Sequence, residues 1–147
     1  ESSIYFKATA PLAITSPLNV GTRKFVLIVD NSITIASTIS VSPGGLFTLL
    51  ARDDITIASS VGSADDPRAR APDISGIFLA GRYFQTGIGT NTLHIRGSVT
   101  GMQGVHLQRQ SQSNAYPAEF FEYDPEQVYR LPQLLRRKNI HTDELIP

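Results

Sequence analysis

The chain has 147 residues, a length typical of one domain with a substantial apolar core. Thirteen Lys and Arg residues balance thirteen Asp and Glu residues, so no net charge favours nucleic acid or an anionic membrane as a partner. The absence of Cys excludes disulfides, thiolate metal ligands and cysteine nucleophiles, and no apolar run approaches the roughly 20 residues of a membrane-spanning helix. We therefore expect one domain with a tail and no membrane-spanning segment.

Short apolar motifs recur along the chain at steps of 21 and 22 residues, which predicts stacked repeats. The motifs of the first series lie at 4–6, 25–27, 47–49, 77–79 and 105–107. Those of the second series lie at 12–16, 33–37 and 55–59, and we assign the fourth copy to 93–97. Those of the third series lie at 18–20, 39–41, Val61 and Val99. Each full repeat thus offers three short apolar stretches.

Apolar and polar residues alternate within these motifs, as in a strand with one buried face and one solvated face. Strands this short bury their apolar face only by stacking on the same strand of the next repeat. Residues that favour turns, mainly Ser, Asn, Gly and Pro, lie between the motifs. We predict an all-β fold over residues 1–115: a short parallel β-solenoid with three sides and about four rungs of 21–22 residues.

Two insertions are predicted in the later rungs, where the period lengthens. The first adds about eight residues near 62–74, and the second lies near 83–91. Loops on a rigid solenoid often carry binding residues. Tyr83 and Phe84 are therefore the candidate residues for ligand contact, since their rings could stack on sugars.

Residues 116–147 differ from the rungs and are predicted to form a capping or docking segment. The segment holds five of the twelve aromatic residues of the chain, so it is too apolar for a disordered tail. A short helix is expected to begin after Asp124, a capping residue that precedes Pro125, and to end before Pro132. The candidate interface residues of this segment are Phe120, Phe121, Tyr123 and Tyr129.

The first rung begins at Ile4, with no amphipathic helix or charged cap ahead of it. An uncovered strand edge pairs readily with other strands, and repeat arrays usually carry capping units for that reason. We expect this end to be covered by another copy of the chain or by an upstream part of the same protein. Ile4 and Phe6 are the candidate interface residues here.

No pattern in the chain predicts catalysis, a cofactor or a metal site. The pairs Asp53-Asp54 and Asp65-Asp66 suit a corner and a local ion pair better than a calcium or catalytic site. His94 and His106 alternate with apolar residues, so both are expected to point outward. Motifs for a serine nucleophile or a phosphate-binding loop are missing, and we expect that the protein is not an enzyme.

The Ile-Thr-Ile-Ala-Ser motifs at 33–37 and 55–59, followed by the aromatic run at 117–125 and Leu131-Pro132, carry a resemblance. They resemble the corresponding parts of β-helical bacterial cell-surface and pilus-associated structural proteins. The resemblance implies an exported structural protein that lies outside the cell or at its surface. It supplies no catalytic residues.

Three functions are compatible with these features. The favoured one is a noncatalytic structural or assembly protein of a bacterial surface or filament, which self-associates through its uncapped first rung and its C-terminal segment. An alternative is a carbohydrate-binding adhesin module that contacts surface glycans through Tyr83, Phe84 and the insertion near 62–74. A polysaccharide-degrading enzyme is disfavoured, because it needs a long cleft with clustered carboxylates.

Overall fold

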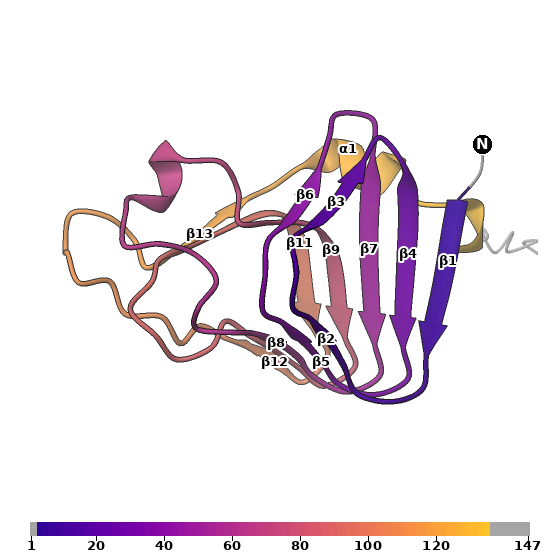
Figure 1. The fold of residues 1–147 in the computed structure, drawn as a ribbon, viewed down its shortest axis with the longest axis horizontal. Helices are drawn as coiled ribbons and strands as arrows, with labels where there is room; N and C mark the ends of the chain where they lie inside the picture. The colour runs from indigo at the N-terminus through magenta and orange to yellow at the C-terminus, as the bar shows by residue number, and fades with distance from the viewer. Residues whose placement is uncertain (1–2, 136–147) are drawn as a thin grey trace, which may run out of the picture.

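The computed structural model describes residues 3–135, which form a parallel β-solenoid with one short α-helix near its C-terminal end (Figure 1). This confirms the predicted fold class. One of its sheets has five strands, one for each turn, so the coil has about five turns where the sequence predicts about four. No helix within residues 3–135 is long and apolar enough to cross a membrane.

The first side of the coil is a ladder of parallel strands joined in register. Its strands are β1 (Ser3–Ala8), β4 (Lys24–Val29), β7 (Leu46–Ala51), β9 (Ile74–Ala80) and β11 (Leu93–Gly101). Their inward-facing side chains form apolar columns that run along the coil. One column consists of Phe6, Leu27, Leu49, Phe78 and Val99.

The second side is a sheet of five three-residue strands. They are β2 (Leu12–Ile14), β5 (Ile33–Ile35), β8 (Ile55–Ile57), β10 (Tyr83–Gln85) and β12 (Gly104–His106). Phe84 lies opposite Ile55, so the fourth motif of the second series is Tyr83-Phe84-Gln85. The assignment of this motif to 93–97 is therefore wrong. Residues 104–106 likewise belong to the second side rather than the first.

The third side is built partly from short strands and partly from the beginnings of longer ones. The short strands are β3 (Leu18–Gly21), β6 (Ile39–Val41) and β13 (Glu119–Glu122). The first residues of β9 and β11 complete the ladder, since Ile39 pairs with Ile74, Ile74 with Ile95, and Ile95 with Phe121. The coil therefore extends to Glu122, past the predicted boundary at residue 115.

The core is the apolar interior of the coil. Four aromatic rings follow one another through it, with centroid distances of 5.8 Å, 6.0 Å and 6.1 Å: Phe25, Phe47, Phe78 and Phe84. Phe47, Phe78 and Phe84 are fully buried. Such offset and edge-to-face pairs add about 0.5–1.5 kcal/mol each beyond the burial of their apolar surface.

Two insertions widen the later turns where the second side meets the third. Residues 58–73 connect β8 to β9, contain the 3-10 helix η1 (Pro67–Ala69), and include most of the predicted insertion at 62–74. The second insertion comprises 86–92, because residues 83–85 of the predicted 83–91 form β10. The insertions therefore occupy one corner of the coil.

The segment after β13 lies along the outside of the coil and is called the tail here (residues 123–135). It contains α1 (Pro125–Tyr129) and η2 (Gln133–Leu135), and Asp124 caps α1 through its side chain, as the sequence predicts. In Figure 1 the tail runs from β13 back toward the β1 end of the coil. Contacts of α1 with β9 show that it packs against the side of the coil.

Candidate functional site

Within residues 3–135, the interior of the coil is open at the β1 end. Ile4 and Phe6, two of the predicted interface residues, are 45% and 53% exposed. Phe6 lines a shallow apolar groove of about 440 Å³ at this end, together with inward-facing residues of the first two turns: Leu12, Ile14, Leu18, Phe25 and Leu27. The edge of β1 has no partner strand within the described chain. This end therefore has the exposed apolar surface and strand edge expected of a docking site.

The last turn exposes a second apolar end. It is formed by the later half of β11, by β12 and by β13, each the last strand of its side among the described residues. Phe121 is 39% exposed there, and Val105 and Leu107 are exposed beside it. The two ends of the coil thus present three strand edges each.

The other predicted interface residues do not form one surface. The ring of Phe120 packs against the ring of His94 with centroids 4.8 Å apart, on the face of β13 that points away from the core. Tyr123 and Tyr129 are exposed on the tail, and Tyr123 directly follows β13. The structure therefore divides the predicted interface between the first turn, the last turn and the tail.

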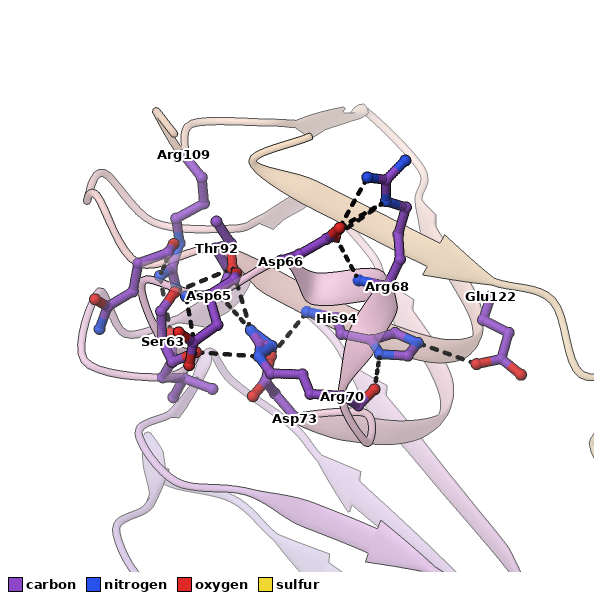
Figure 2. A network of polar contacts seen from close by, with 12 residues as sticks. Ser63, Asp65, Asp66, Arg68, Arg70, Asp73, Thr92, His94, Arg109 and Glu122 are labelled. Atoms are coloured by element: carbon purple, nitrogen blue, oxygen red, sulfur yellow. Dashed lines mark hydrogen bonds and ion pairs between the residues drawn. The ribbon is translucent and has the colours of Figure 1, made fainter. Parts of the chain in front are cut away.

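A polar network joins the insertion after β8 to β11 and β13 (Figure 2). The Arg70 guanidinium donates to Asp73 Oδ2 at 2.9 Å and to the Thr92 carbonyl at 2.7 Å. The same Asp73 oxygen accepts from the His94 amide at 2.8 Å. The His94 ring lies between the Arg70 carbonyl, 3.0 Å from Nδ1, and Glu122 Oε2, 3.0 Å from Nε2. His94 faces away from the apolar core, but these contacts bury it, so the expectation of a solvent-exposed side chain is wrong.

Arg109 fills the interior of the widened corner and is only 6% exposed. Its guanidinium donates five hydrogen bonds of 2.7–3.1 Å to backbone carbonyls that belong to both insertions and their flanking residues: Ala58, Ser59, Val61, Thr86 and Asn91. Burial lowers the pKa of Arg109, although Glu119 and Asp73 act in the opposite direction. This side chain therefore replaces the apolar core where the insertions leave carbonyls without strand partners.

Burial also raises the pKa of Asp73 above its ordinary value, outweighing the His94 amide and the Arg70 guanidinium. Asp66 behaves differently, since its exposed carboxylate accepts hydrogen bonds from Arg68 and its pKa is lowered. The pairing of Asp66 with Arg68 confirms the predicted local ion pair in this loop.

The acidic pairs have structural partners. Asp54 accepts a hydrogen bond from the Tyr83 amide at 3.1 Å, and Asp53 pairs with Arg52. Asp65 accepts a hydrogen bond from the Ser63 hydroxyl. Within residues 3–135 no group of three or more His, Asp or Glu side chains is arranged to hold a metal ion. These carboxylates therefore fix corners and loops.

The two predicted ligand-contact residues differ from what sugar stacking requires. Phe84 is fully buried, so its ring presents no face to a ligand. The ring of Tyr83 stacks on His106 with centroids 4.6 Å apart, and the Arg82 guanidinium lies 5.9 Å from its centroid. The Tyr83 ring is thus engaged within the protein.

The chain was compared with protein-family models, with curated proteins and with solved structures, and none of the three comparisons finds a match.

Proposed function

We propose that this protein is a noncatalytic structural subunit that assembles end to end, with the last turn of one copy stacked on the first turn of the next. The proposal places it in a filament or on a bacterial surface, and the likeness of its repeats to β-helical surface proteins supports that location.

The equivalence of the two ends carries the proposal. Three inward-facing columns run through the coil and end in Phe6, Leu12 and Leu18 at the first turn. The same columns end in Val99, Val105 and Phe121 at the last turn. A stacked second copy would therefore place an apolar side chain on an apolar side chain in every column. It would also continue the parallel ladders across the junction.

A head-to-tail contact of this type joins two different surfaces and leaves one of each free. The axis of stacking is the axis of the coil, so successive copies add along one line and do not close into a ring. The expected product is a filament. Its stability comes from backbone hydrogen bonds along the strand edges and from burial of the exposed apolar ends, at about 25 cal/mol per Å² of apolar surface.

Cross-linking tests the predicted register, because the chain has no native Cys. Tyr5 and Ser98 occupy the first and last positions of one outward-facing column, through Val26, Thr48 and Ile77. In the stacked pair their Cα atoms would lie about 4.8 Å apart, within the range of a disulfide. A chain carrying both Tyr5→Cys and Ser98→Cys should therefore form covalent multimers on mild oxidation.

The matched control carries Lys7→Cys with Ser98→Cys. Lys7 faces the same way as Tyr5 but lies two residues along β1, which places the Cα atoms about 8 Å apart, beyond disulfide range. Cross-linking of both variants to the same extent would refute the register.

Assembly itself is measured on the unmodified chain by light scattering and electron microscopy. A monomer at every concentration would refute the proposed function and would favour further turns of the same polypeptide as the cover of the first turn.

The same surface gives a second test. Phe6→Lys puts a charge into the open groove and should abolish assembly, because charged side chains at strand edges block pairing. Lys7→Glu, on the outward face of the same strand, leaves the groove intact and should leave assembly in place. Filaments formed by Phe6→Lys would contradict the proposed contact.

A further inference from the structure

A polar cavity of about 450 Å³ lies between the tail and the side of the coil. One wall is the turn between β6 and β7, and Ser75 of β9 and Arg96 of β11 lie beside it. Tail residues complete the lining: Tyr123, Asp124, Pro125, Glu126, Gln127 and Arg130. The volume falls in the usual range of small-molecule sites. No lining residue belongs to the three inward-facing columns used in end-to-end assembly, so the two proposals rest on different side chains.

The charged groups of the lining are balanced. Two guanidinium groups, Arg96 and Arg130, face two carboxylates, Asp124 and Glu126. Arg96 lies 3.3 Å from Asp124, and Arg130 lies 2.6 Å from Glu126. A free anion or cation gains little from such paired charges. The hydroxyl of Ser75 and those pairs still offer donors and acceptors side by side, which suits a neutral ligand rich in hydroxyl groups.

The aromatic residue of the lining is accessible. Tyr123 is 67% exposed, and it has no aromatic ring partner within residues 3–135. An exposed ring beside grouped donors and acceptors can stack on the apolar face of a pyranose while the hydroxyl groups of the sugar bind the polar lining.

Gln127 belongs to the buried part of the lining. The residue is 2% exposed, its carboxamide nitrogen donates to Asp124 at 3.3 Å, and its carboxamide oxygen has no hydrogen-bond partner among the described residues. Leaving such an acceptor buried and unpaired costs about 1–3 kcal/mol. This oxygen lies beside Gly97 of β11, 3.2 Å from where a Cβ at that glycine would stand, so it takes no part in the proposed contacts.

We infer that this cavity binds a neutral saccharide, with Tyr123 stacked on one sugar ring and the pairs Arg96–Asp124 and Arg130–Glu126 hydrogen-bonded to its hydroxyl groups. Binding is expected in the millimolar range, as for a small polar ligand on a partly open site. Specificity lies in the combination of a ring face with several hydroxyl groups.

The test is a titration of the full ¹⁵N-labelled chain, followed by NMR, with four probes: methyl glucoside, methyl galactoside, sorbitol and glucuronate. We expect at least one pyranoside to shift the backbone amides of Ser42, Ser75 and Tyr123. Sorbitol, which has hydroxyl groups but no ring, and glucuronate, which carries a charge, should bind at least about fivefold more weakly.

Variants assign the contacts. Tyr123→Ala should weaken pyranoside binding about five- to tenfold, whereas Tyr123→Phe should change it less than about twofold. Tyr129→Ala, an exposed tail residue outside the lining, is the matched control and should leave binding unchanged. Because Tyr123 is exposed, its substitution should leave the fold intact, which the amide spectrum checks. The inference is overturned if neither pyranoside shifts these amides, if Tyr123→Ala binds as well as the unmodified chain, or if sorbitol or glucuronate binds as tightly.

Discussion

Substitution of Arg109 by Met tests the assignment of this side chain as the polar core of the widened corner. Met keeps much of the volume of the Arg stem but removes every donor. Two of the five carbonyls, those of Val61 and Thr86, accept their bonds from Arg109 in fully buried surroundings, and the other three are partly accessible to water. Each buried acceptor left unpaired costs about 1–3 kcal/mol, so the loss expected from these two alone is about 2–6 kcal/mol.

Relaxation of the loops lowers the upper end of this range, and we expect a decrease of about 2–5 kcal/mol in the free energy of unfolding. Urea titration followed by circular dichroism measures it. The free energy of unfolding of Arg109→Lys should lie between those of the unmodified chain and Arg109→Met, because an ammonium group has three donors and a guanidinium has five. The control is Arg52→Met, which breaks exposed ion pairs with Asp30 and Asp53 and should cost less than about 1 kcal/mol. Equal losses for Arg109→Met and Arg52→Met would refute the reasoning.

Three further substitutions test the packing of the coil. Phe47→Ala removes the second ring of the aromatic column and should lower the free energy of unfolding by about 3–5 kcal/mol in urea, and a loss below about 1 kcal/mol would contradict the buried position. Gly97 has a φ of 127°, and a Cβ added there by Gly97→Ala would overlap the Gly76 carbonyl, so this substitution should lower the free energy of unfolding, measured by thermal unfolding, by well over 2 kcal/mol. The control is Gly44→Ala, whose Cβ meets open space and which should cost roughly 1 kcal/mol. Because burial raises the pKa of Asp73, the folded state binds more protons than the unfolded state between the ordinary and the raised value. The difference in unfolding free energy, unmodified chain minus Asp73→Asn, should therefore fall as pH rises through that window, and a rising difference would reverse the assigned cause.

The period of the apolar motifs was enough to predict the coil and its three sides, but not the side to which each later motif belongs. Leu93-His94-Ile95 has the same apolar-polar-apolar pattern as Ile55-Thr56-Ile57, whereas Tyr83-Phe84-Gln85 does not, because Phe84 is the residue that stands at the position of Ile55. A triplet with the apolar-polar-apolar pattern is compatible with a strand on any of the three sides. The deciding quantity is the distance from the preceding inward residue: six residues separate Leu49 from Ile55, and six separate Phe78 from Phe84. This spacing of six is present in the sequence, but at Phe84 an aromatic residue takes the place of the Leu or Ile found in the earlier copies.

The open first turn could also be predicted, because a repeat array that begins directly with a strand motif leaves a strand edge uncovered. The burial of polar side chains at the widened corner could not be predicted from the sequence. In a short strand a polar residue flanked by apolar ones is expected to face solvent, and this rule holds until an insertion covers the outer face. His94 is buried because residues 62–73 and β13 come to lie against it, and neither contact has a signature near His94. The sequence around Arg109 likewise does not predict its burial, because the carbonyls that it contacts belong to distant insertions.

The tail changes how the coil is expected to open. In a linear array each turn contacts only its neighbours, so the end turns fray without disturbing the rest. Here the tail leaves the fifth turn and packs beside the turn between β6 and β7 and beside β9, so distant turns share one contact. Fraying of the last turn would release these contacts as well. Amide hydrogen exchange should therefore protect β13 and the β6–β9 region to a similar degree, as one cooperative unit.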